Sequence, residues 1–236
     1  MKNKFIATVF AGALMVAPLA AKAEGTGLWT GVDFAPDSYF VYLGGVTGLQ
    51  SQDIRTQDGW LARASVGFGN YDYDTPAVPG GNVDSDVFTG DLMLGYGHHF
   101  GNGTISFYAG GEFQNHDPGP NDPNNSVDGT EGGVKGQVEL NVHPAENCVL
   151  DLAGSYSTAF DSYWTRGFGG YDFGPVTIGT EIGFIGNEEW HQVRFGASAG
   201  DVDFGFVNAR AYVGYANNDS RGDDGMYGGI AFGKGF

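Results

Sequence analysis

The sequence predicts an all-β fold: an antiparallel, up-and-down transmembrane β-barrel of about twelve strands. Three observations predict it. Most of the chain consists of segments of about ten residues in which apolar and polar side chains alternate, which is the period of a strand. Short turns alternate with longer, more polar connections along the chain. The two chain ends carry the signals of export and of sheet closure.

The N-terminal end has the three parts of a signal peptide in the right order. Two lysines precede an apolar run over residues 5–17, and Ala21-Lys22-Ala23 follows as an Ala-x-Ala cleavage site. The apolar run is too short to cross a bilayer as a helix. We therefore expect residues 1–23 to be a signal peptide and residues 24–236 to form a single outer-membrane barrel domain.

Charge and composition exclude several classes of protein. Removal of residues 1–23 deletes Lys2, Lys4 and Lys22 and no acid, which moves the formal charge from -17 to about -20. Such a chain is not attracted to nucleic acid, so no nucleic-acid partner is expected. The single cysteine, Cys148, allows no intramolecular disulfide. Outside the signal peptide no run of about 20 apolar residues occurs, which excludes a helical membrane protein.

The first six expected strands each have one apolar and one polar face. They span residues 28–34, 39–47, 60–68, 87–100, 104–114 and 131–142. Residues 60–68 illustrate the pattern, because Trp60, Val66 and Phe68 fall on one face while Arg63 and Ser65 fall on the other. A strand of about ten residues with one apolar face has the length and pattern of a tilted membrane-spanning strand.

The next five expected strands repeat this two-sided pattern, with one weaker member. They span residues 149–157, 163–172, 176–185, 192–199 and 206–215. The alternation is least regular over 163–172. If the first two segments or the long loops are misinterpreted, ten or fourteen strands are the alternatives to twelve.

The last expected strand, residues 226–236, keeps strand periodicity up to the final residue, Phe236. Chain ends usually fray, so a terminal aromatic residue indicates that something apolar receives it. The terminal Phe resembles the signal by which the barrel-insertion machinery recognises outer-membrane barrels. Lys234 departs from that signal, because a hydrophobic residue is usual there.

The connections favour a barrel over other all-β folds. Expected short turns at 101–103, 143–147, 173–175 and 200–203 alternate with longer loops at 70–84, 115–130, 159–162, 186–190 and 216–225. Outer-membrane barrels have short periplasmic turns and longer outer loops. The link over 50–58 is long although it falls on the expected short side. A soluble periplasmic barrel or sandwich is the alternative interpretation.

If the apolar face contacts lipid, the polar face lines the lumen. The charged candidates for the lumen are Arg63, Asp91, Glu112, Lys135, Glu139, Asp151, Glu181, Arg194 and Arg210. Charges of both signs in a narrow lumen pair with one another and stiffen the barrel. A selective path for a polar solute is the alternative interpretation of the same residues.

Several loop residues are candidates for binding a ligand or a metal ion, and each also has a purely structural explanation. Phe160, Tyr163 and Trp164 are candidates for contact with a glycan, or they belong to an interfacial aromatic girdle. Two loops rich in Asp and Asn, within 117–128 and 217–224, carry oxygen ligands that suit calcium, but their order matches no known calcium loop and fits ordinary turns. We expect no metal site and no cofactor.

The histidines raise the hypothesis of a lipid-modifying barrel enzyme. His191 together with Ser162 or Ser198 would supply a nucleophile and its base, but no spacing in the sequence requires that pairing. No nucleotide-binding loop and no Gly-x-Ser-x-Gly elbow is present. We therefore expect no catalytic residues and no enzymatic activity.

Four stretches of the sequence resemble a known family. These are Thr89-Gly90-Asp91-Leu92-Met93-Leu94-Gly95-Tyr96, residues 111–125, residues 154–164 and residues 178–188. They are similar to the BcsS family of cellulose biosynthesis proteins. The resemblance implies an accessory protein of bacterial cellulose production in the outer membrane of a Gram-negative bacterium, and it implies no catalytic residue.

The expected function is therefore a non-enzymatic barrel that assists cellulose biosynthesis, export or anchoring. Its expected partners are outer-membrane lipid, the barrel-insertion machinery, and cellulose or other components of cellulose secretion. A porin-like channel for small solutes is the first alternative, and the lipid-modifying enzyme is the second.

Overall fold

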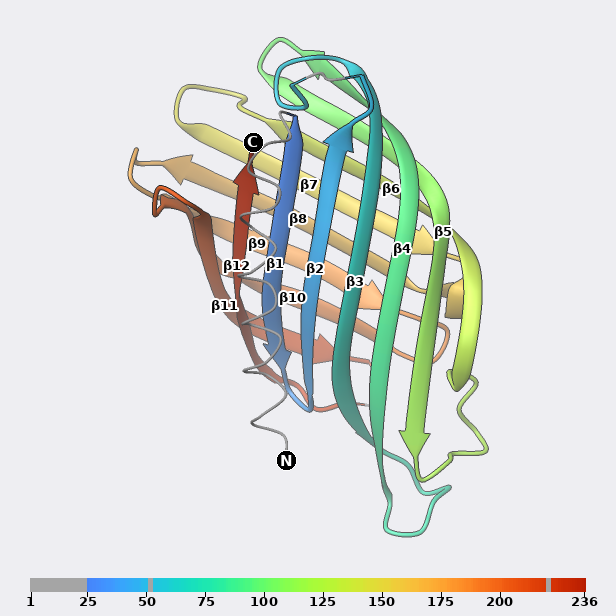
Figure 1. The fold of residues 1–236 in the computed structure, drawn as a ribbon. Helices are drawn as coiled ribbons and strands as arrows, with labels where there is room; N and C mark the ends of the chain where they lie inside the picture. The colour runs from blue at the N-terminus through green and yellow to red at the C-terminus, as the bar shows by residue number, and fades with distance from the viewer. Residues whose placement is uncertain (1–24, 51–52, 220–221) are drawn as a thin grey trace.

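The chain forms a closed barrel of twelve antiparallel strands in the computed structural model, which describes residues 25–50, 53–219 and 222–236 (Figure 1). The strands are β1 (Thr26–Ala35), β2 (Ser38–Gly48), β3 (Gly59–Asp74), β4 (Asn82–Phe100), β5 (Gly103–Gly119), β6 (Gly129–Val142), β7 (Cys148–Ser157), β8 (Tyr163–Asp172), β9 (Thr177–Gly186), β10 (His191–Asp203), β11 (Asn208–Asn218) and β12 (Gly225–Gly235). A short 3-10 helix, η1 (Ala159–Asp161), lies between β7 and β8. The expected signal peptide, residues 1–23, lies outside the described residues.

Each strand pairs with its neighbours in the chain, and β1 pairs with β12 to close the sheet. The terminal residue takes part in this closure: the Phe236 backbone N–H donates to the Thr26 carbonyl at 2.7 Å, and the Phe236 carbonyl accepts from Gly25 at 2.7 Å. Closure leaves no strand edge unpaired. The predicted all-β, up-and-down barrel of twelve strands is therefore confirmed.

The two rims of the barrel differ in the connections they carry. We call one end the long-loop rim, which carries the short turn at 36–37, the loops at 75–81, 120–128, 158–162 and 187–190, and the described part of 219–224. The other end is the short-turn rim, which carries 101–102, 143–147, 173–176 and 204–207 and the described part of 49–58. Strands β3, β4 and β5 project furthest at the long-loop rim, at the bottom of Figure 1, and the C-terminus lies at the opposite rim.

The expected loops at 70–84 and 115–130 are wrong in extent. Strand β3 continues to Asp74 and pairs there with β4, and β5 continues to Gly119, so the loops shrink to 75–81 and 120–128. In these extensions the outer face is polar, with Asp86 opposite Asp117. The apolar outer face, from which a lipid-contacting strand is predicted, therefore ends several residues before the backbone hydrogen bonding of the strand ends.

The expected turn at 200–203 is also wrong. Strand β10 runs through it to Asp203, with a register shift against β11 between Ala199 and Val202, and the chain reverses at residues 204–207. A bulge places two residues opposite one, so the period of two that sequence analysis follows is interrupted there.

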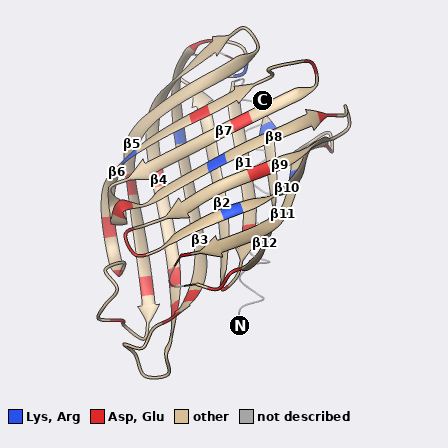
Figure 2. Ribbon diagram, turned by 180° about the vertical axis from the view of Figure 1, so that it is seen from behind, with Lys and Arg blue, Asp and Glu red and all other residues tan. Residues whose placement is uncertain are grey.

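The outer and inner faces of the barrel have opposite character. Large apolar side chains are exposed on the outside, among them Trp60, Val66, Phe88, Leu92, Leu94, Phe107, Val134, Phe195 and Ile230. Charged residues of both signs occur on the strands (Figure 2), and those that line the lumen form ion pairs such as Arg63–Asp91 and Arg166–Glu181. A soluble protein would bury this apolar surface, whereas a lipid-facing wall exposes it.

Within the described residues, no helix is long and apolar enough to cross a membrane.

Small residues let large rings lie flat on the inner wall. An added Cβ at Gly44 would stand 2.3 Å from the Trp29 ring, and one at Gly229 would stand 2.4 Å from the Tyr212 hydroxyl. Glycine in a strand commonly marks such a close approach. These close contacts fix the positions of two rings that lie against charged side chains of the lumen.

Candidate functional site in the barrel lumen

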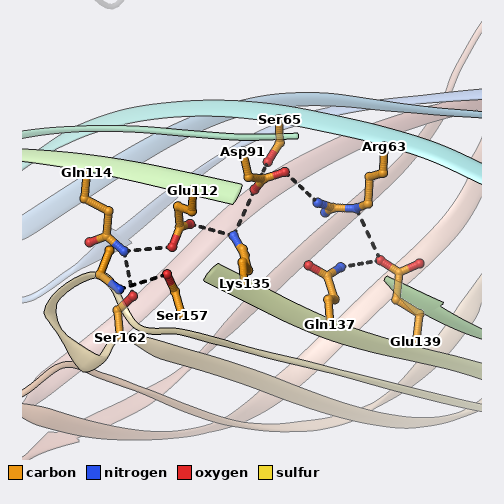
Figure 3. A network of polar contacts seen from close by, with 11 residues as sticks. Arg63, Ser65, Asp91, Glu112, Gln114, Lys135, Gln137, Glu139, Ser157 and Ser162 are labelled. Atoms are coloured by element: carbon orange, nitrogen blue, oxygen red, sulfur yellow. Dashed lines mark hydrogen bonds and ion pairs between the residues drawn. The ribbon is translucent and has the colours of Figure 1, made fainter. Parts of the chain in front are cut away.

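Lys135 is the central cation of a network inside the barrel (Figure 3). Its Nζ donates to Asp91 Oδ2 at 2.9 Å and to Glu112 Oε1 at 2.7 Å. The side chains are 13%, 4% and 7% exposed for Lys135, Asp91 and Glu112. One ammonium group thus bonds to two carboxylates on neighbouring strands in a largely dry environment.

Arg63 extends this network around the wall. Its Nη1 donates to Asp91 Oδ1 at 3.2 Å, and its Nε lies 3.7 Å from Glu139 Oε1. Strands β4 and β5 separate Arg63 from Glu139, so this ion pair reaches across part of the lumen. The guanidinium also lies 4.7 Å from the centre of the Trp29 ring, a cation–π contact.

A loop from the long-loop rim folds in to join the network. Gln114 Nε2 donates to Glu112 Oε2 at 3.0 Å and to Ser162 Oγ at 2.6 Å, as Figure 3 shows. Within the same loop Phe160 is only 4% exposed and has a φ of 51°. A left-handed conformation is costly for a bulky residue, so burial of this ring against His116 compensates backbone strain.

A second network lies on strands β8 to β12 and β1. Arg194 pairs with Asp33 at 3.4 Å, and Tyr212 donates to Asp33 at 2.7 Å. Glu181 pairs with Arg166 at 3.3 Å and accepts a hydrogen bond from Tyr227 at 2.9 Å. Asp33 and Glu181 therefore each pair with an arginine and each accept a hydrogen bond from a tyrosine hydroxyl.

One ion pair connects distant walls at the level of the short-turn rim. Arg210 Nη2 of β11 lies 3.3 Å from Asp151 Oδ2 of β7, although three strands lie between these two. The same guanidinium lies 4.4 Å from the centre of the Phe168 ring of β8. We call the ion pairs of Arg63, Lys135, Arg166, Arg194 and Arg210 the charged belt.

The lumen contains two cavities beside the charged belt. The larger, of about 770 Å³, opens towards the long-loop rim and is lined there by Asp37, Val127 and Trp190. The smaller, of about 470 Å³, lies towards the short-turn rim and is lined by Ile54 and Thr104 among others. Both cavities share the lining residues Val46, Glu139, Trp164 and Arg166, which stand at their junction.

All nine charged residues expected in the lumen line one of these cavities. Arg63, Asp91, Glu112, Lys135, Glu139, Glu181 and Arg194 line the larger cavity, and Asp151 and Arg210 line the smaller one. The sequence analysis missed Asp33, Arg166 and the tyrosines that bond to the carboxylates. Arg166 lies in the segment with irregular alternation. Because Trp164, Arg166 and Phe168 are every second residue, they share one face of the strand, and this spacing could have placed Arg166 in the lumen.

The three aromatic candidates for glycan contact lie in three different environments. Phe160 is buried under its own loop. Tyr163 lies at the long-loop rim, where its hydroxyl and His191 Nδ1 are 3.0 Å apart. Trp164 points into the lumen and lines both cavities.

The structure does not bring together the serines and the histidine of the enzyme hypothesis. His191 bonds and stacks with Tyr163, whereas Ser162 accepts from Gln114. Ser198 is buried and its strand register places it on the opposite face of β10 from His191.

The Asp- and Asn-rich loops bond within themselves and to neighbouring elements of the barrel. Asp122 accepts the backbone N–H of Asn124 at 2.9 Å, Asn125 donates to Tyr73, and Asp224 accepts from Asn217 and Asn218. Over the described ranges no group of three or more His, Cys, Asp or Glu side chains is arranged to hold a metal ion.

The long connection 49–58 at the short-turn rim is attached to the barrel at two points. Ile54 packs against the buried cluster of Leu61, Met93 and Tyr108. Asp58 accepts the His99 backbone N–H at 2.7 Å and lies 2.7 Å from His98 Nδ1, and these two bonds hold the pKa of Asp58 below its usual value. This connection therefore reaches into the barrel mouth.

Fold and lumen together define a class: twelve-stranded antiparallel barrels with a polar lumen and an apolar outer wall. Two solved structures with a similar fold are channels. The COG4313 outer membrane channel from Pseudomonas putida F1 is similar with a TM-score of 0.56 and 14% identity, over 89% of this chain and 94% of that one. A TodX deltaS2S3 mutant monoaromatic hydrocarbon channel is similar with a TM-score of 0.51 and 10% identity, over 93% and 92%.

The KdgM porin, at a TM-score of 0.47 and 12% identity over 89% of this chain and 99% of that one, is a more distant likeness. A search of curated proteins finds no match to the sequence. The family model for cellulose biosynthesis protein BcsS matches residues 27–236. The chain belongs to the BcsS family, which confirms the resemblance drawn from its motifs.

Proposed function

We propose that this protein is a non-enzymatic outer-membrane barrel that assists cellulose production by holding the polymer at the cell surface, rather than by conducting it through the lumen. The observation that carries this proposal is the charged belt. Its ion pairs connect strands that are not neighbours, Arg63 to Glu139 and Arg210 to Asp151, beside two adjoining cavities.

A polysaccharide passing through this lumen would have to separate those ion pairs. The carboxylates of Glu139 and Asp151 are partly exposed, so the larger cost comes from the buried pairs of Lys135, because breaking a buried pair leaves uncompensated charges. Lys135 pairs with two carboxylates that are 4% and 7% exposed. The energetics therefore favour a polymer that contacts the long-loop rim over one that threads the barrel.

The outer wall supports an outer-membrane location. Large apolar side chains exposed around the barrel suit contact with lipid acyl chains, and the pairing of β1 with β12 leaves no open sheet edge within a bilayer. In this orientation the long-loop rim faces the cell exterior and the short-turn rim faces the periplasm.

A small-solute channel is the second candidate function. The two cavities share four lining residues, so a narrow path between them would open if the charged belt rearranged. Steady ionic conductance of the purified protein in planar bilayers would favour this candidate over the first.

The proposed function is tested by deleting the gene in frame. We expect less cellulose at the cell surface and unchanged cellulose synthase activity in isolated membranes. Loss of both would contradict a role in export or anchoring. Complementation with the wild-type gene controls for effects on neighbouring genes.

A further inference from the structure

We propose that the larger cavity is a binding site for a neutral β-linked glucose oligomer, with Trp164 and Trp190 as its stacking platforms. This inference deepens the proposed function and rests on it. It assigns a ligand class to a cavity of about 770 Å³ that opens at the long-loop rim. That volume is within the usual range for small-molecule sites.

Some aromatic rings that line the cavity have an arginine guanidinium group over one face, and others do not. Arginine guanidinium groups lie over Trp29, Tyr212 and Tyr227, at 4.7, 5.9 and 5.3 Å from the ring centres. In the part of the chain that the structure describes, Trp164 and Trp190 line the cavity without a ring or cation partner. Ring faces of this kind are available to the apolar faces of a sugar.

Both tryptophans are held in place by the backbone. Trp164 is paired in the sheet, opposite Ser155 on one side and Ile185 on the other. Trp190 sits in a tight turn in which Asn187 Oδ1 accepts the N–H groups of Glu189 and Trp190, at 2.9 and 3.2 Å. Fixed platforms reduce the conformational entropy that a ligand must overcome.

The charge of the cavity favours a neutral ligand. Its four cations are already paired with carboxylates of the charged belt, and Asp37, Asp72 and Glu189 add negative charge near the opening. An anionic sugar would meet this negative field without a free cation to bind. A cationic ligand would have to compete with the arginines and the lysine that the carboxylates already hold.

The polar groups of the lining favour a sugar over a hydrocarbon. Gln137, Ser155 and Asn125 line the cavity and can donate to or accept from hydroxyl groups. A hydrocarbon in the same place would displace water from these groups without replacing its hydrogen bonds, which costs affinity.

The test is isothermal titration calorimetry of the full barrel in detergent with cellotetraose. We expect binding by the wild type, weakened about tenfold or more by Trp164→Ala and largely restored by Trp164→Phe. Trp60→Ala is the matched control, because Trp60 is 53% exposed on the outer wall, and it should leave binding unchanged. Faster migration of the unboiled protein on SDS gels verifies that each variant is folded.

Three results would overturn the inference: no binding of cellotetraose, binding that Trp164→Ala leaves unchanged, or tighter binding of toluene, oligogalacturonate or a glucosamine oligomer. Failure here together with loss of surface cellulose in the gene deletion would reject the ligand site and keep the proposed function. Binding together with a deletion that has normal surface cellulose would keep the ligand site and reject the proposed function.

Discussion

Lys135 is the residue on which the charged belt most depends, because one ammonium group satisfies both Asp91 and Glu112. Lys135→Ala leaves two buried carboxylates facing each other, and we expect a loss of about 3 kcal/mol in the free energy of unfolding. The measurement is the temperature at which the fast-migrating, unboiled form is lost on SDS gels.

The exposed ion pair of Arg55 and Asp53 supplies the control for Lys135→Ala. Arg55 is 62% exposed, so Arg55→Ala should leave that temperature unchanged. Equal effects of the two substitutions would mean that Lys135 is as well solvated as the exposed Arg55, and would contradict a stabilising role of the buried pairs.

Gly44 tests the packing that positions Arg63. A Cβ at this position would stand 2.3 Å from the Trp29 ring, which supports the Arg63 guanidinium. Gly44→Ala should destabilise the barrel by about 1–3 kcal/mol through overpacking. Gly136→Ala is the matched control, since no atom lies within 4 Å of its added Cβ. Equal midpoints in urea unfolding for the two variants would contradict this packing.

At the residue scale, the sequence predicts which charges face the lumen but not which of them meet. Alternation assigns Arg63, Glu139 and Arg210 to the inner face. The pairing of Arg210 with Asp151 depends on how the closed barrel brings β11 towards β7, and no local pattern encodes that distance. Phe160 was predicted as a surface contact because a loop residue is usually exposed. Its burial depends on a tertiary contact with His116.

At the scale of elements, the connection 49–58 is the departure from the usual pattern of short periplasmic turns. Asp58 attaches it to the start of the hairpin between β4 and β5 through His98 and His99. Because these bonds lower the pKa of the carboxyl group, they contribute stability above its unfolded pKa, and the contribution is lost as the pH falls through the lower, folded pKa.

Asp58→Ala should therefore reduce stability at pH 7 and have no effect at a pH below the folded pKa. The measurement is the difference between the urea midpoints of wild type and variant as a function of pH. A difference that stays constant into strong acid would contradict a role for the ionised carboxylate.

Strands β3 and β10 both extend further than their side-chain alternation predicts. The apolar side of β3 predicts a strand only as far as Phe68, yet hydrogen bonding carries the strand to Asp74. Beyond the lipid, both faces of a strand meet water, and the alternation that reveals it disappears. The turn after β10 was predicted too early because the bulge in β10 interrupts the two-residue alternation of side chains.

At the scale of the whole molecule, the count of strands and the up-and-down order follow from sequence because each strand pairs with its chain neighbours. Closure follows as well, since the final strand is periodic to Phe236. Whether the lumen is open does not follow from sequence, because it depends on the reach of side chains across the barrel. In the structure Arg63, Lys135 and Arg210 each reach a carboxylate on a strand that is not their neighbour in the sheet.

The central claim, a barrel whose lumen is closed by the charged belt, is tested most directly by conductance in planar lipid bilayers. We predict no steady conductance for the wild type and several-fold more frequent openings for the double variant Asp151→Ala and Arg210→Ala, which removes an ion pair between distant walls. A wild-type protein that conducts steadily, at the level of the double variant, would contradict the claim and make the small-solute channel the better account.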